Sequence, residues 1–149
     1  MRESCIRTPE ILLPKPGTDL KRWAAVACDQ YTSEPEYWEA FGDFVGDAPS
    51  TLRCTYPEVW LGKGEDARIR SIDETIGRYL AEGVFVRRRG MVLVERRVGG
   101  ERRTGVVLAV DLEDYSFRPE DRALIRATEG TILERIPPRV RIRENAKAE

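Results

Sequence analysis

The chain has 149 residues, a length typical of one domain, with a net charge of −1 and a sequence pI of about 5.8. This charge balance argues against a non-specific nucleic-acid-binding domain, and the absence of histidine leaves acid–base chemistry to carboxylates, tyrosine, cysteine or lysine. The longest apolar runs fall far short of the ~20 residues of a membrane span, so we expect no membrane segment. The three cysteines lack CxxC spacing and form neither a disulfide framework nor a zinc site, so we expect a cytoplasmic protein.

The first half of the chain predicts two strands and a helix. Residues 11–17 read as an extended arm that two prolines interrupt, and "WAAVAC" at 23–28 reads as a short buried strand. Ser33 stands three residues before Glu36, which is the capping-box pattern, so a helix is predicted from there to about Val45. Its aromatic residues recur at helical spacing and are expected in the core rather than on a cofactor.

The second half predicts a Pro-interrupted strand region at 52–61 and an amphipathic helix from Glu65 to about Glu82, with Gly83 at its C-cap. β-branched runs follow between 84 and 115, joined by two tight antiparallel connections at Gly90 and at 99–100. A short helix near residue 131 is expected to stop at two prolines, with "RVRIR" after it as a strand or a helix. The order predicts a single α+β domain over 1–149, in which two main helices and a short helix near the C-terminus pack on a mixed or mainly antiparallel sheet.

The stretch "AVACDQYTSEPEYW" at 25–38 holds the first candidate site. A buried strand that ends in Asp29 and passes within four residues into a helix would place this carboxylate beside free helix N–H groups, where small anions often dock. The alternative interpretation is a capped turn in which Asp29 accepts backbone hydrogen bonds.

The stretch "VDLEDY" at 110–115 holds the second candidate site. Asp111 follows the most hydrophobic predicted strand, and Glu113 and Asp114 come directly after it. Three carboxylates in four residues can hold Mg²⁺ or supply a base, and they can equally form a solvated turn. If the strands that end at Asp29 and Asp111 run side by side, the two carboxylates would face one another.

The segment 125–145 is the one locally basic stretch with matching turn chemistry. Thr131 and Glu134 repeat the capping-box pattern, Gly130 allows close approach of a ligand, and the arginines suit a phosphate or carboxylate. The candidate anion ligands are Arg126, Thr128, Thr131, Arg135, Arg139 and Arg143. The alternative is an Arg-rich solvated edge that pairs with the acidic clusters.

Several long segments resemble a known family. They are "PEILLPK", "WAAVACDQYTSEPEYWE", "VGDAPSTL", "LAVDLEDY" and "LIRATEGTILERIPPRVRIRENA", and together they look like the amino-terminal part of a bacterial family of unknown function, the domain of unknown function numbered 1015. The resemblance implies a link to the ParB and sulfiredoxin fold group, which includes nucleotide-dependent free serine kinases and nucleotide-hydrolysing partition proteins. Members usually continue to a Gly-x-His-Arg or Gly-Asn-His-Ser type segment, so we expect this chain to be an amino-terminal portion.

The combined prediction is a protein that binds a phosphorylated small molecule or nucleotide, with kinase or phosphate-transfer activity only in the complete protein. ATP or ADP with Mg²⁺ is the cofactor that this interpretation implies, and Asp29 or Asp111 would orient the metal or a hydroxyl as the catalytic group. The alternative is a non-catalytic interaction or structural module whose arginines pair with its own acids or with a partner subunit, which leaves homo-oligomerisation open. Nucleic-acid contact through the Arg-rich runs at 87–103 is the weakest option, because these runs lack interleaved aromatics.

Overall fold

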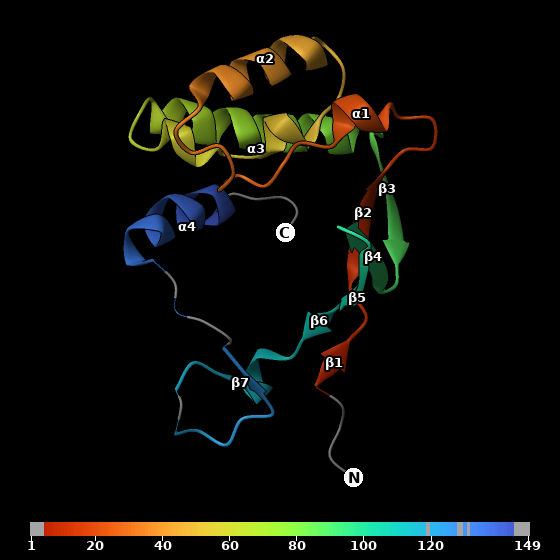
Figure 1. The fold of residues 1–149 in the computed structure, drawn as a ribbon, viewed down its shortest axis with the longest axis vertical. Coiled ribbons are helices and arrows are strands. Elements are labelled where there is room, and N and C mark those ends of the chain that lie inside the picture. Colours follow the sequence, from red (N-terminus) through yellow and green to blue (C-terminus); the bar gives the residue numbers. More distant parts are fainter. Residues whose placement is uncertain (1–4, 119, 128–129, 131, 145–149) are drawn as a thin grey trace. The chain divides into compact units, whose positions relative to one another are not determined.

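The computed structural model describes residues 5–118, 120–127, 130 and 132–144, and it divides into two compact units. Unit 1 is built from residues 1–13 and 87–130, and unit 2 from residues 14–86 and 131–149. Figure 1 shows that the helices belong to unit 2, whereas most strands belong to unit 1. The mixed α+β class is therefore as predicted.

Unit 2 contains four α-helices and three short 3₁₀ helices among the described residues. The helices are α1 (Leu20–Trp23), α2 (Pro35–Val45), α3 (Glu65–Ala81) and α4 (Ile136–Glu144), and the 3₁₀ helices are η1 (Thr51–Cys54), η2 (Glu58–Trp60) and η4 (Leu133–Arg135). No helix in the described part of the chain has both the length and the apolar character that crossing a membrane requires.

Within the part of the chain that the structure describes, the strands form four two-stranded sheets instead of one broad sheet. In unit 1, β1 (Ile6–Arg7) pairs antiparallel with β6 (Ala109–Val110), β4 (Val92–Val98) pairs antiparallel with β5 (Glu101–Val107), and β7 (Tyr115–Ser116) pairs parallel with β8 (Ile125–Arg126). The 3₁₀ helix η3 (Leu112–Asp114) separates β6 from β7. The remaining sheet joins β2 (Glu10–Pro14) and β3 (Phe85–Arg89), the two strands along which the chain passes from one unit into the other.

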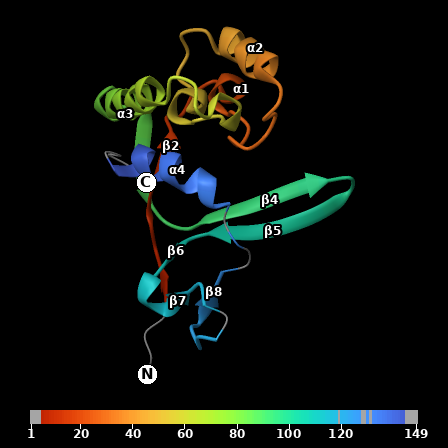
Figure 2. The ribbon, with the colours of Figure 1, turned by 90° about the vertical axis from the view of Figure 1, so that its left-hand side faces the viewer.

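The hairpin predicted at 99–100 is confirmed, and the connection predicted at Gly90 is wrong. Gly99 and Gly100 have φ angles of +57° and +86°, the left-handed conformation that a tight hairpin turn needs at both positions, and β4 and β5 form the long ribbon of Figure 2. At Gly90, β3 and β4 belong to different sheets, because the Gly90 N–H donates to the Pro9 carbonyl and keeps the chain beside the amino-terminal segment.

The predicted strand at 23–28 is not formed. Trp23 ends α1, and residues 24–27 have no regular structure. Hydroxyl groups take the place of a neighbouring strand: Ser50 Oγ and Thr51 Oγ1 both donate to the Trp23 carbonyl, and the Ala25 N–H donates to Thr51 Oγ1. Because these backbone groups are satisfied, the apolar segment needs no sheet. The strand predicted at 52–61 is likewise replaced by η1 and η2.

The helix predictions are confirmed with corrections at the ends. Helix α2 begins at Pro35 after Glu34, which makes no side-chain cap, so the capping box at Ser33 is not formed. Helix α3 ends as predicted, because Gly83 has φ +64° and the Val84 N–H returns to the Tyr79 carbonyl at 3.0 Å, which is a Schellman closure.

The two prolines near the C-terminus were predicted to end a short helix, and this prediction is wrong. Pro137 and Pro138 lie in the first turn of α4 and begin this helix instead of ending one, since a first turn needs no backbone N–H donors. "RVRIR" is therefore helical. The first part of the predicted capping box, Thr131, lies outside the described residues.

The core of unit 2 is aromatic. Trp23 and Tyr79 are 7% and 3% exposed, and Phe85 packs against both rings in edge-to-face geometry, at centroid distances of 5.6 and 5.9 Å. The Tyr79 hydroxyl accepts a hydrogen bond of 3.0 Å from the N–H of the fully buried Ser50. This bond ties α3 to the loop that leads into η1.

Candidate anion-binding site

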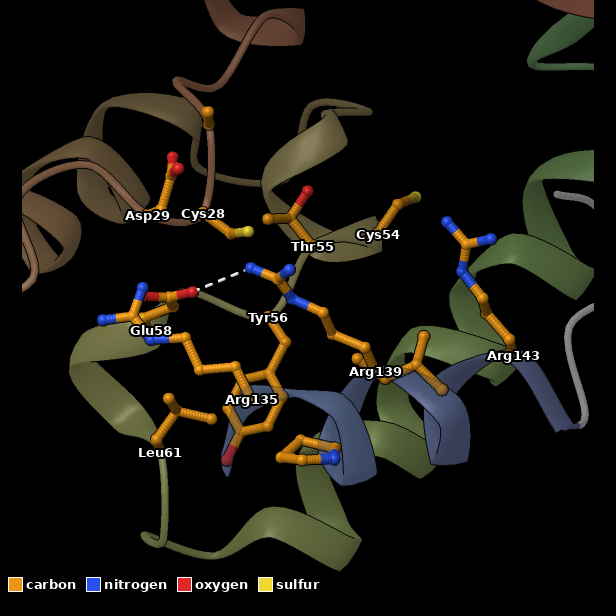
Figure 3. Close-up of a pocket in the computed structure, with 13 residues that line it drawn as sticks. Cys28, Asp29, Cys54, Thr55, Tyr56, Glu58, Leu61, Arg135, Arg139 and Arg143 are labelled. Atoms are coloured by element: carbon orange, nitrogen blue, oxygen red, sulfur yellow. Dashed lines mark hydrogen bonds and ion pairs between the residues drawn. The ribbon is translucent and has the colours of Figure 1, made fainter. Parts of the chain in front are cut away.

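A pocket of about 490 Å³ lies in unit 2 between the segment 27–29, the segment 54–61 and helices η4 and α4 (Figure 3). It brings together charged side chains with neutral polar and aliphatic ones. The lining residues that carry the argument are Cys28, Asp29, Cys54, Tyr56, Glu58, Arg135, Arg139 and Arg143.

Glu58 is the acidic centre of this pocket. Its side chain is only 6% exposed, and its two carboxylate oxygens lie 2.6 Å from Arg135 Nη1 and 2.9 Å from Arg139 Nη2. The Glu58 N–H donates to the Cys28 carbonyl at 2.9 Å, which fixes η2 against the segment before Asp29. Two guanidinium groups thus share one buried carboxylate, and their positive charge is only partly neutralised.

Arg143 lies one helical turn beyond Arg139 on α4 and lines the same pocket (Figure 3). It has no hydrogen-bond or ion-pair partner within the described chain. With Arg135 and Arg139 it makes three guanidinium groups against the carboxylates of Glu58 and Asp29, an excess of one positive charge. The pocket therefore favours an anionic guest.

Two further polar groups of the pocket, Cys54 and Tyr56, stay neutral. Burial raises the pKa of the Cys54 thiol to about 11, although Arg53 and Arg78 lower it. Burial also raises the pKa of Tyr56, with the Glu65 charge as the second cause, and its hydroxyl donates to the Trp60 carbonyl at 3.1 Å. Neither group offsets the positive charge at neutral pH.

Arg141 points to the other side of α4 and binds this helix to the start of α3. Its guanidinium pairs with Glu65 at 3.6 Å and with Asp66. The hydrogen bond and charge of Arg141 lower the pKa of Asp66. Arg141 and Glu58 were not among the predicted site residues, and no local signal identifies Glu58, which lies far from α4 along the chain.

One family comparison gives a match. The sequence model of a family described as "Protein of unknown function (DUF1015)" matches residues 12–149. The chain belongs to the DUF1015 family. Among curated proteins and solved structures, no match was found. The family resemblance is confirmed, and the link to the ParB and sulfiredoxin fold group stays a prediction.

Half of the predicted site residues line the pocket of this DUF1015 chain. Asp29, Arg135, Arg139 and Arg143 all line it. Asp29 lies in a turn after an irregular segment, and Figure 3 shows its carboxylate pointing away from Arg135 and Arg139. One of its oxygens accepts a hydrogen bond of 3.3 Å from the Gln30 amide.

Asp111 and Arg126 belong to unit 1. Asp111 follows β6 and caps η3, because one oxygen accepts from the Glu113 N–H at 3.2 Å while the other pairs with Arg7 at 2.8 Å. These contacts agree with the turn alternative, and a catalytic role stays a prediction. Arg126 lies in β8, in register with Ser116. Thr128 and Thr131 lie outside the described residues.

The described residues contain no preformed cluster of side chains that could bind a metal ion. Within residues 5–118, 120–127, 130 and 132–144, no three Asp, Glu or Cys side chains are grouped to hold an ion. The Asp111 carboxylate is used in the turn and in the ion pair with Arg7.

Proposed function

We propose that unit 2 binds a phosphorylated small molecule, with nucleotides such as ATP or ADP as one class, in the pocket between η2 and α4. The observation that carries this proposal is the arginine set: Arg143 is unpaired among the described residues, next to two arginines that share Glu58. A guanidinium group donates in a planar fork that matches phosphate oxygens, and such charge-assisted bonds are about twice as strong as neutral ones.

The rest of the pocket suits the uncharged part of such a ligand. Its volume of about 490 Å³ falls within the range of roughly 300–1,000 Å³ that small-molecule sites occupy. Leu61, Pro138 and Ile142 offer apolar contact, and Thr55 offers a hydroxyl. The ligand phosphate would lie at Arg143 and the outer side of Arg139, because Glu58 already occupies the inner side.

Calorimetric titration of the purified chain with ATP, ADP, serine and inorganic phosphate tests this proposal. We expect a phosphorylated ligand to bind, and Arg143→Ala to weaken its binding by about tenfold or more, because a charged hydrogen bond is lost. Arg70→Ala, on the exposed side of α3, is the matched control and should leave binding unchanged. The proposal fails if no phosphorylated ligand binds, or if the two variants weaken binding equally.

A non-catalytic interaction or structural module is the second candidate. It is favoured by the pairing of Arg135, Arg139 and Arg141 with acids of the same chain. In this case Arg135→Ala should destabilise the fold, and Arg143→Ala should change neither folding nor any ligand titration. Comparing the two variants by urea unfolding and by calorimetry separates a ligand site from a purely structural arginine cluster.

Kinase or phosphate-transfer activity is a further proposal for a complete family architecture in the cytoplasm, a compartment that suits the free cysteines of the described chain. Asp29 or Asp111 would orient Mg²⁺ or the accepting hydroxyl. The test is release of ADP from ATP with Mg²⁺ and serine, by this chain and by the longest gene product, with Asp29→Asn and Asp111→Asn as variants. Unchanged turnover in both variants would remove these residues from the reaction.

A further inference from the structure

The hairpin of β4 and β5 exposes apolar side chains on both faces. Of its strand residues only Val92 is half-buried, and the others are exposed. Leu93, Val98 and Val106 are 74%, 62% and 54% exposed. A two-stranded hairpin with neither face covered is only marginally stable in water. The exposed apolar side chains therefore indicate that another surface covers the hairpin.

The two faces of the hairpin differ in how their charges are satisfied. On one face Glu95 pairs with Arg97 at 2.9 Å and with Arg102 at 3.4 Å. On the other face Arg96 lies directly opposite Arg103, and neither has an ion-pair partner within the described residues. Like charges in directly opposed positions destabilise a strand pair unless a counter-charge is supplied.

We call this second face the arginine face. By the register and the alternation of side chains it consists of Val94, Arg96, Val98, Glu101, Arg103 and Val107. A hollow of about 270 Å³ lies on it, lined by Arg96, Val98, Glu101 and Arg103. It therefore combines apolar contact area with two arginines against one glutamate, an excess of one positive charge, and a matching partner would be both apolar and acidic.

Helix α2 carries the complementary surface. On the side away from the buried Trp38 and Val45, helical spacing places two acidic residues that have no ion-pair partner in the described chain, Glu36 and Asp43. Aromatic rings lie beside them in a row, in which Tyr37 and Phe41 stack at 6.4 Å and Phe41 lies 6.2 Å from Phe44. Phe44 is 49% exposed, and Arg22 already lies over its ring at 5.7 Å, which shows that the row accepts a guanidinium.

We propose that two copies of this chain form a reciprocal dimer, in which the arginine face of each hairpin docks on the acidic, aromatic face of α2 in the other copy. Arg96 and Arg103 would meet Glu36 and Asp43, and the exposed valines would meet Phe44. One chain supplies both surfaces, so each copy can both offer its hairpin and receive that of the other. Such mutual exchange makes two identical contacts related by a twofold axis, whereas a one-way contact would build longer chains. This interface is separate from the anion pocket and does not depend on the proposed ligand.

Sedimentation or light scattering of the full chain measures the assembly directly. We expect a mass of about 34 kDa, twice the 17.0 kDa of one chain. Arg96→Glu with Arg103→Glu, and separately Glu36→Lys with Asp43→Lys, should each give a monomer of 17.0 kDa, because like charges then face one another. Glu74→Lys with Glu82→Lys on and after α3 makes the same charge change outside the interface and should remain dimeric.

The decisive measurement mixes the two charge-reversed variants. Both contacts are then opposite in charge again, so a dimer of one copy of each variant should re-form, and its recovery also proves that each variant is folded. Docking of the hairpin on α2 within the same chain would not be rescued by mixing. A wild-type chain that stays monomeric at high concentration, or a mixture that stays monomeric, overturns the proposal.

Discussion

The carboxylate of Glu58 lies 2.9 Å from the guanidinium of Arg139, although 81 residues separate them along the chain. The glutamate side chain is 6% exposed and the arginine side chain 50% exposed, so the pair joins the interior of η2 to the outer surface of α4. Of the apolar residues of α4, Ile136 and Val140 are 37% and 47% exposed, whereas Ile142 is half-buried. The ion pairs with Glu58 therefore add to a limited apolar contact in attaching α4.

Glu58→Gln tests this attachment. We expect the free energy of unfolding to fall by about 1–2 kcal/mol, less than for a fully buried pair because both arginines are partly exposed. We also expect phosphate-containing ligands to bind more tightly, since Arg135 and Arg139 are released. Urea unfolding and calorimetry measure the two effects. Glu74→Gln, exposed on α3, serves as the control, and equal behaviour of the two variants would contradict the role of Glu58.

Tyr79→Phe tests the bond between α3 and the loop before η1. The change removes the acceptor of the buried Ser50 N–H and leaves that donor without a partner, which typically costs about 1–3 kcal/mol. Thermal or urea unfolding gives the value. Tyr37→Phe is the matched control, because the Tyr37 hydroxyl makes no hydrogen bond among the described residues. A loss no larger than in this control would show that the hydrogen bond adds nothing.

The lowered pKa of Asp66 beside Arg141 predicts that the free energy of unfolding depends on pH. The hydrogen bond and charge of Arg141 hold the pKa of Asp66 below its ordinary value of 3.8. Because the folded-state pKa is the lower one, the ionised carboxylate stabilises the fold at pH values above about 4, and this contribution disappears as the pH falls through the lowered pKa.

Unfolding of the wild type and of Asp66→Asn should therefore differ at pH 6 and converge in strong acid. The carboxylate is exposed, so the difference should also shrink in high salt. Glu82→Gln, which follows α3 and lies away from α4, should show no such convergence. A difference between wild type and Asp66→Asn that grows toward low pH has the wrong sign and would reject the mechanism.

We expect the thiol of Cys54 to react slowly with alkylating reagents in the folded chain. A rise of its pKa from 9.0 to about 11 lowers the thiolate fraction at pH 8 by about 100-fold. Mass spectrometry after treatment with iodoacetamide should find Cys54 unmodified when the chain is folded and modified when it is unfolded in urea. Modification of Cys54 at the same rate in both states would show that the thiol is not protected by burial.

The sequence predicts helices better than strands in this chain, for a physical reason. Helix α3 can be predicted from the spacing of Ile69, Ile72 and Tyr79 and from the glycine after its end, because both signals are local in the sequence. The segment 23–28 has the composition of a buried strand, but hydroxyl groups of Ser50 and Thr51 satisfy its backbone. Such a substitution depends on residues more than twenty positions away, so composition alone cannot reveal it.

The candidate site was predictable in part. Arg135, Arg139 and Arg143 could be named from local basicity, and their spacing keeps Arg139 and Arg143 together once the segment is a helix. Their buried acidic partner could not be named, because Glu58 follows Pro57 in a segment that reads as a strand. The importance of Arg141 was hidden for the same reason, since its partners open another helix.

Each unit is assembled from two separate stretches of the chain, and this limits how the protein can be dissected. A fragment that stops at Val86 would lack α4, and Glu58 would lose both of its cationic neighbours. To isolate unit 2, residues 1–13 must be removed and residues 87–130 excised, with the flanks of the excised segment rejoined by a flexible linker. Deletion experiments on this chain should therefore remove the internal segment 87–130, because truncation from the carboxyl end at residue 86 would break up both units.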